Sequence, residues 1–310
     1  MAMVKREEER DYLRIAIIHG RIRYQAKRQN MHKLSAIIAD VMSREDEIPD
    51  LLVLPPYPLT GPLIGYNNYE RTMRYIKSNA ERVNEKGYTV QFIRQRMTPY
   101  YTSVLAGPII ERAGPKLFNT MLLVDQDHVT VHRYRKISVS SLEAEYKVNP
   151  GKVPGVFIIP GMNTLERRIG VFIENDIMHG EIFRMLSILN SWVIIGAVMP
   201  TPYLKPLTVN DEKEGVYTVN TSLLESLAAV RAMESKVPVI VVGAILENVH
   251  GELMSIAPTI IADPDMGIVK VQQEEDVLRL DVAPPEHDGP CDVECKNIIQ
   301  VAQKYYRQRF

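Results

Sequence analysis

The sequence predicts an α/β protein in which layered sheets of mixed strand direction carry helices on their outer faces. Two observations support this fold class. In the N-terminal part, short β-branched runs alternate with segments of helical periodicity, which favours parallel strands joined by helices. In the C-terminal part, strands follow one another through short turns, which favours antiparallel hairpins.

The first elements alternate between strand and helix. Residues 14–18 (RIAII) predict a strand, and apolar residues at helical spacing predict an amphipathic helix over 24–43. Residues 51–54 predict a second buried strand, which the prolines after it end because proline cannot continue a hydrogen-bonded ladder. A polar helix with several tyrosines is expected over 67–86.

The rest of the chain continues with strands and two more helices, expected over 180–190 and 219–235. The segments 125–128 and 263–267 contain residues that favour hairpin turns. The predicted strands span 103–107, 120–124, 129–134, 169–173, 192–198, 237–242, 259–262, 268–271 and 277–280.

Three segments follow from this pattern: a charged N-terminal segment over 1–12, a globular domain over 13–282, and a linker with a helical tail over 283–310. We expect the tail to bury one apolar stripe against the domain or against a partner. The stripe comprises Cys291, Cys295, Ile298, Ile299, Ala302, Tyr305 and Tyr306.

Composition excludes several classes of protein. The formal net charge of −1, from 37 basic and 38 acidic side chains, gives no global reason to expect binding to nucleic acid or to a membrane. The two cysteines, Cys291 and Cys295, exclude a disulfide framework and fit a cytoplasmic protein. We expect no signal peptide and no membrane helix. The basic run Arg133, Arg135 and Lys136 is interpreted as a solvated face.

Four stretches, in this order, resemble the nitrilase superfamily of carbon–nitrogen hydrolases, and the match covers about residues 13–282. The first resembles the family's Pro-Glu and Leu-Thr-Gly segment, and the second its Tyr-Asn-Thr to Tyr-Arg-Lys segment. The third resembles the stretch with the second active-site glutamate, and the fourth the nucleophile region Ile-Gly-Val-x-Ile-Cys-Tyr-Asp. They are residues 51–61 (LLVLPPYPLTG), 118–136 (FNTMLLVDQDHVTVHRYRK), 145–151 (EYKVNPG) and 168–184 (RIGVFIENDIMHGEIFR).

The resemblance implies a four-layer α-β-β-α sandwich with two mixed sheets and a homodimer or higher homo-oligomer. It also implies four site positions. Pro56 stands where the family has its general base, and Glu174 stands where it has the nucleophilic cysteine. Lys136 matches the catalytic lysine, and Glu145 matches the second glutamate. Asn175 replaces the tyrosine after the cysteine.

These replacements remove the chemistry that the family reaction requires. A thiolate attacks the carbonyl carbon in that reaction, and the glutamate moves the proton. A glutamate is a much poorer nucleophile toward an amide, and proline accepts no proton. We therefore hypothesise that Lys136 and Glu174 form an ion pair across the former active site, with Glu145 nearby.

The leading hypothesis is a catalytically inactive protein that acts as a binding or scaffold protein, with no cofactor and with a protein partner or a small polar ligand. Lys136, Glu145, Glu174 and Asn175 would contact that ligand. The alternative is a hydrolase of small amides or nitriles with a rebuilt site. A third hypothesis is an RNA- or protein-associated factor that uses the basic tail over 304–310.

Two other constellations compete for the site. Ser138, Ser140 and Ser141 follow Lys136, so a serine–lysine nucleophile is conceivable, but a structural role is favoured because no spacing rule is met. Glu174, Asp176 and His179 offer metal-ligand atoms. Asp176 matches a structural family position, so no metal site is predicted.

Overall fold

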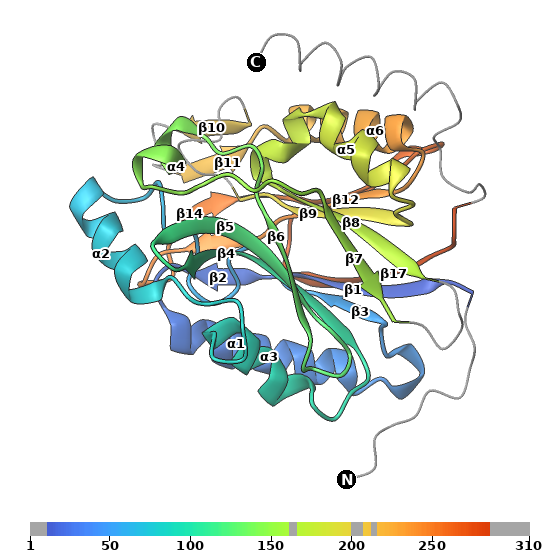
Figure 1. Cartoon of the computed structure of the whole chain (residues 1–310), viewed down its shortest axis with the longest axis horizontal. Helices are drawn as coiled ribbons and strands as arrows, with labels where there is room; N and C mark the ends of the chain where they lie inside the picture. Colours follow the sequence, from blue (N-terminus) through green and yellow to red (C-terminus); the bar gives the residue numbers. More distant parts are fainter. Residues whose placement is uncertain (1–10, 161–165, 200–206, 212–215, 286–310) are drawn as a thin grey trace.

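Two β-sheets pack face to face and helices cover their outer faces, which confirms the predicted four-layer α-β-β-α sandwich (Figure 1). The computed structural model describes residues 11–160, 166–199, 207–211 and 216–285. Most of the segments 1–12 and 283–310, with Cys291, Cys295 and the expected apolar stripe, lie outside the described residues.

The first sheet combines a parallel centre with an antiparallel meander. Its central strands β1 and β3 are buried except at Arg14, as parallel strands covered on both faces require. The order is β17 (Asp276–Val282), β1 (Leu13–His19), β3 (Leu51–Val53), β4 (Ser103–Ala113), β5 (Lys116–Val124) and β6 (Val131–Arg135).

The second sheet is also mixed, because β8, β9 and β12 run parallel whereas the strands beside them run antiparallel. Its apolar side chains meet those of the first sheet in one core cluster, which includes Ile17, Leu123, Ile173 and Ile195. The order is β16 (Gly267–Gln272), β15 (Thr259–Asp263), β12 (Val239–Val242), β9 (Val193–Ala197), β8 (Arg167–Ile173) and β7 (Gly155–Ile159).

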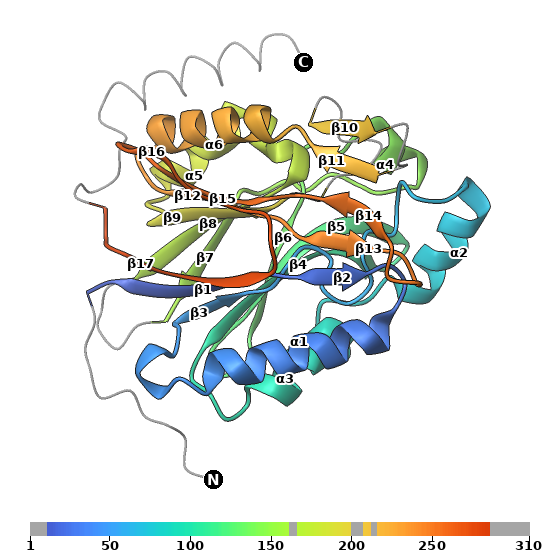
Figure 2. The same ribbon diagram turned by 180° about the vertical axis from the view of Figure 1, so that it is seen from behind.

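Two helices cover each sheet from outside (Figures 1 and 2). α1 (Lys27–Met42) and α3 (Tyr88–Met97) pack on the first sheet, and α5 (Gly180–Ile188) and α6 (Thr221–Ser235) pack on the second. On α6 the residues Leu224, Ala228 and Ala232 are buried at four-residue spacing, which places one stripe against the sheet.

A smaller sheet lies at one end of the sandwich (Figure 2). Its strands are short, and the sequence pattern predicted none of them because three or four residues show no clear periodicity. The order is β10 (Thr208–Asp211), β11 (Val216–Val219), β14 (Leu253–Ile256), β13 (Ile245–Glu247) and β2 (Arg21–Arg23).

The single helix predicted over 67–86 is wrong in its extent. The structure has α2 (Tyr69–Asn79), whose C-cap is Ala80, and the separate α3 after Gly87. The Asn68 side chain accepts the amide proton of Arg71 and caps α2, so its start was recognisable. The unpredicted α4 (Ser141–Glu145) and the short helix η2 (Glu174–Met178) both position the site described below. A further short helix, η1, spans Glu45–Glu47.

No helix in the described part of the chain is long and apolar enough to span a membrane.

Replacing Gly155 at the start of β7 with alanine should destabilise the sandwich. The new Cβ would lie 2.4 Å from Val171 Cγ2 and 2.6 Å from the Tyr134 ring, and both side chains are buried. Overpacking of this kind costs about 1–3 kcal/mol, which a lowered urea midpoint measures. Gly20→Ala is the control because its nearest contact is 3.4 Å. Equal midpoints for the two variants would contradict this packing.

Candidate functional site

Three charged side chains form a closed cluster at the ends of β6 and β8. The Lys136 ammonium donates to Glu143 Oε2 at 2.8 Å and to Glu174 Oε2 at 2.7 Å. All three residues have an exposed fraction of 0%, so solvent does not reach their charged groups. The hypothesised ion pair between Lys136 and Glu174 is therefore present, and a second carboxylate completes it.

Two polar side chains extend this ion cluster. Tyr57 OH donates to Glu174 Oε1 at 2.7 Å, and Asn119 Nδ2 donates to Tyr57 OH at 3.2 Å and to Glu143 Oε1 at 3.1 Å. Every carboxylate oxygen of Glu143 and Glu174 thus accepts at least one hydrogen bond. Buried charges need such partners because water no longer solvates them. Hereafter "ion cluster" means Lys136, Glu143 and Glu174 with Tyr57 and Asn119.

The second carboxylate is Glu143, which corrects the expectation for Glu145. Ser140 begins α4 with a capping box: its hydroxyl accepts from Glu143 N at 3.2 Å, and its own N–H donates to Glu143 Oε2 at 2.9 Å. This cap turns the Glu143 side chain back toward Lys136. Glu145 lies two positions further along the helix, on another face, and is exposed.

The turn after β8 aims Glu174 inward. Glu174 has φ 49°, a left-handed conformation that costs energy for a residue with a side chain. Asp176 stabilises the turn by accepting from Ile173 N at 2.9 Å, Ser138 N at 2.8 Å and Tyr134 OH at 2.8 Å. The turn therefore places Glu174 fully inside, whereas the adjacent Asn175 is only partly buried.

Burial and charge shift the protonation of the ion cluster. Burial raises the pKa of Glu174, and the negative charge of Glu143 raises it further, against the opposing effect of Lys136 and Tyr57. Burial alone would lower the pKa of Lys136, but the two carboxylates outweigh it and the pKa is raised. The Lys136 ammonium therefore keeps its proton.

The site residues Tyr57, Asn119 and Glu143 were not predicted from the sequence. Pro56 is buried at the expected strand end, but Tyr57 supplies the polar group there, with φ 50°. Asn119 lies inside the family-like segment 118–136, so its position there was the available signal. Glu143 could have been recognised from Ser140, because serine followed three residues later by glutamate is a capping-box signature.

The two alternative groups, the serines after Lys136 and the possible metal ligands, make contacts of a different kind. His179 Nε2 lies 2.8 Å from Ser138 Oγ, and Ser140 is the helix cap. Asp176 is engaged by Tyr134 and two backbone amides, so Glu174, Asp176 and His179 do not converge on one point. Within the described ranges, no group of three histidine, cysteine, aspartate or glutamate side chains could hold a metal ion.

Most of the chain matches the model of one protein family. The model of the carbon–nitrogen hydrolase family matches residues 14–285, which is most of the chain. The chain belongs to the carbon–nitrogen hydrolase family. No curated protein matches it.

Solved structures share the fold at low identity. Nit3 from Saccharomyces cerevisiae, a nitrilase-superfamily member, is 18% identical with a TM-score of 0.67, over 88% of this chain and 90% of that chain. A superfamily protein from Xanthomonas campestris with an arsenic adduct in its active site is 17% identical with a TM-score of 0.65, over 88% and 91%. An amidase from Nesterenkonia, whose active-site cysteine carries an acetamide moiety, is 16% identical with a TM-score of 0.65, over 92% and 95%.

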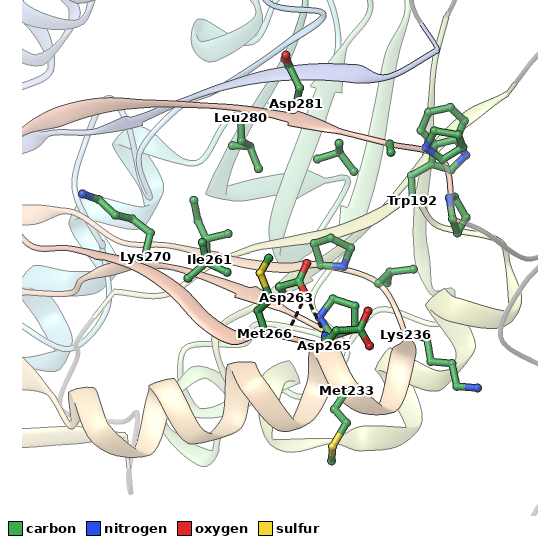
Figure 3. Close-up of a pocket in the computed structure, with 18 of the residues that line it drawn as sticks. Trp192, Met233, Lys236, Ile261, Asp263, Asp265, Met266, Lys270, Leu280 and Asp281 are labelled. Carbon is green, nitrogen blue, oxygen red and sulfur yellow. Dashed lines mark hydrogen bonds between the residues drawn. The ribbon is translucent and has the colours of Figure 1, made fainter.

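A large cleft lies away from the ion cluster, between β17, β15 and the end of α6 (Figure 3). Its volume is about 990 Å³. Ile261, Leu280 and Met266 line it together with charged side chains such as Lys270 and Asp281. Lys136, Glu143 and Glu174 do not line this cleft, so it is separate from the ion cluster.

Glu143→Ala should lower the free energy of unfolding by about 1.5–3 kcal/mol, because Lys136 loses one of its charged hydrogen bonds inside the protein. Glu145→Ala is the matched control in the same helix, and its exposed site predicts a change within about 0.5 kcal/mol. Chemical denaturation measures both. A larger loss in the Glu145 variant would restore Glu145 as the partner of Lys136.

The raised pKa of Glu174 predicts a pH-dependent stability. The folded state holds this proton more tightly than the unfolded chain, whose pKa is 4.5, so the contribution is complete below that pH. It is lost as the pH rises through the folded pKa. Glu174→Gln should therefore make the slope of unfolding free energy against pH less negative in that window, by up to about 1.4 kcal/mol per pH unit. Parallel slopes for the two proteins would contradict the shift.

Proposed function

We propose that this chain is a non-catalytic member of the carbon–nitrogen hydrolase family that acts as a binding or scaffold protein. The observation that carries the proposal is the absence of cysteine from residues 14–285, because Cys291 and Cys295 both follow the family match. The family reaction as the resemblance implies it needs a thiolate, which is strongly nucleophilic at neutral pH.

The state of Glu174 supports the same conclusion. In the proposed alignment Glu174 occupies the nucleophile position, where it contacts the Lys136 ammonium and accepts from Tyr57. A carboxylate tied by these bonds is a weak nucleophile, and its attack on an amide would produce an anhydride. At the proposed position of the general base, Pro56 has no proton acceptor in its side chain. The nucleophile and the general base that the family reaction requires are therefore both missing.

Lys136 then acquires a structural role in place of oxyanion stabilisation. An ammonium that is fully buried between two carboxylates already has its charge compensated. Moving it toward a substrate oxyanion would leave Glu143 and Glu174 buried without their counter-ion, which is costly. We infer that the ion cluster stabilises the fold at the former catalytic centre, and that binding involves other surfaces of the protein.

A second candidate function rests on one contact. Ser138 Oγ and His179 Nε2 lie 2.8 Å apart, and His179 is exposed to solvent. A serine hydroxyl within reach of an imidazole is the arrangement of a nucleophile and its base, so this pair favours the alternative of a hydrolase with a rebuilt site. Among the described contacts, no buried carboxylate bonds to His179 and orients it as the third residue of a triad would. The non-catalytic proposal is therefore better supported.

Hydrolysis of small amides and nitriles tests both candidates. We expect the natural sequence to release no ammonia above the uncatalysed rate, because it lacks the thiol and the base. The double substitution Glu174→Cys with Pro56→Glu introduces the two missing groups, and it should gain measurable turnover.

Turnover by the natural sequence would contradict the proposal. Ser138→Ala and His179→Ala then identify the source, since loss of turnover in both variants would establish the serine–histidine pair. Glu145→Gln serves as a control that touches neither the pair nor the ion cluster.

A further inference from the structure

A cleft opens on the side of the sandwich where both sheets end. β6 is the last strand of the first sheet and β7 the last strand of the second, and the two lie side by side (Figure 1). The cleft between them has a volume of about 920 Å³. Strands β6 and β7, the start of β5 and the loop over 149–154 line it.

All the charged side chains that line this cleft are basic. Four permanently cationic side chains line it, namely Lys116, Arg133, Arg135 and Lys152, and His132 is the fifth basic residue. None of the described lining residues is an aspartate or a glutamate. Because the whole chain has a formal net charge of only −1, this local excess is a property of the cleft.

A buried carboxylate holds the two arginines in fixed positions. Glu111, 1% exposed, accepts from Arg135 Nε at 2.8 Å, from Arg135 Nη2 at 2.8 Å and from Arg133 Nη1 at 3.1 Å. Burial opposes ionisation of Glu111, but Arg135, Thr120 and Arg133 outweigh it, and its pKa is lowered. One anion therefore orders two guanidiniums, which leaves an excess of positive charge at the surface.

Ring stacking adds to this order. The Arg135 guanidinium lies 3.8 Å from the centre of the Phe118 ring, which restrains its plane. The side chains of Arg133 and Arg135 remain 50% and 29% exposed, so a molecule in the cleft can reach them. Guanidiniums that are already ordered lose less conformational entropy when they bind an anion.

We propose that this cleft binds the phosphoryl group of a small phosphorylated molecule. Four permanent cations against the single carboxylate of Glu111 leave three positive charges. A phosphomonoester carries a charge of about −1.5 to −2 at neutral pH and offers three acceptor oxygens, whereas a carboxylate carries one charge. Guanidiniums fit phosphate oxygens in a bidentate manner.

The size of the cleft indicates that the ligand is larger than phosphate alone. Phe157, Val153 and Pro154 supply apolar surface beside the basic residues. Ligand sites of this volume combine apolar walls with a few oriented polar groups. The ligand class is therefore a phosphorylated molecule about as large as a nucleoside monophosphate, with an apolar or aromatic part.

Calorimetric titration with adenosine monophosphate at low salt is the test, with adenosine and inorganic phosphate as partial ligands. We expect saturable binding at one site per chain, weaker binding of phosphate, and weak or no binding of adenosine. Arg133→Gln should lower the affinity about tenfold or more because a charged hydrogen bond is lost, and Lys152→Gln should lower it as well. Both substitutions leave the Arg135–Glu111 contacts in place.

Arg74→Gln with Lys77→Gln is the matched control, since both residues are exposed on α2 and do not line the cleft. It removes the same kind of charge and should leave the affinity unchanged. An equal loss in the control, equal binding of adenosine, or no saturable binding would overturn the proposal. An RNA oligonucleotide that binds more tightly than the mononucleotide, and equally to Arg133→Gln, would also overturn it. Amide hydrolysis is independent of these outcomes.

Discussion

The burial of the Lys136 ammonium is the constraint on which the rest of this site depends. A charge with no solvent contact is stable only if opposite charges and hydrogen bonds surround it. Glu143, delivered by the cap of α4, and Glu174, delivered by a left-handed turn after β8, meet that requirement. Their remaining oxygen atoms are satisfied by Tyr57 and Asn119, so each member of the ion cluster restricts the others.

Strand β6 contacts both the interior and the surface, because its successive side chains point to opposite faces of the sheet. Tyr134 points inward and donates to Asp176, which stabilises the turn that carries Glu174. Arg133 and Arg135 point outward to Glu111 and the basic cleft. Lys136, directly after the strand, enters the ion cluster. The basic run Arg133, Arg135 and Lys136, predicted to be one solvated face, is thus divided between interior and surface.

Much of the fold could be predicted from the sequence, because long buried strands and the helix α1 have clear periodicity. The pair Lys136–Glu174 could be predicted because a motif fixed both positions. Glu143 was missed because the prediction followed the spacing of a family motif, whereas the capping box at Ser140 decides which glutamate turns inward. The three-residue β2 and the break before Gly87 were missed because tertiary contacts, rather than local pattern, determine them.

A double-mutant cycle with Lys136→Met and Glu174→Met tests the central claim most directly. If the buried pair dominates this site, Lys136→Met alone should cost about 3–5 kcal/mol of unfolding free energy because it leaves two carboxylates buried without a counter-ion. The double variant should be more stable than the sum of the two single losses predicts, by at least about 2 kcal/mol. Losses that add within about 0.5 kcal/mol would show that the two side chains do not depend on each other and would contradict the account.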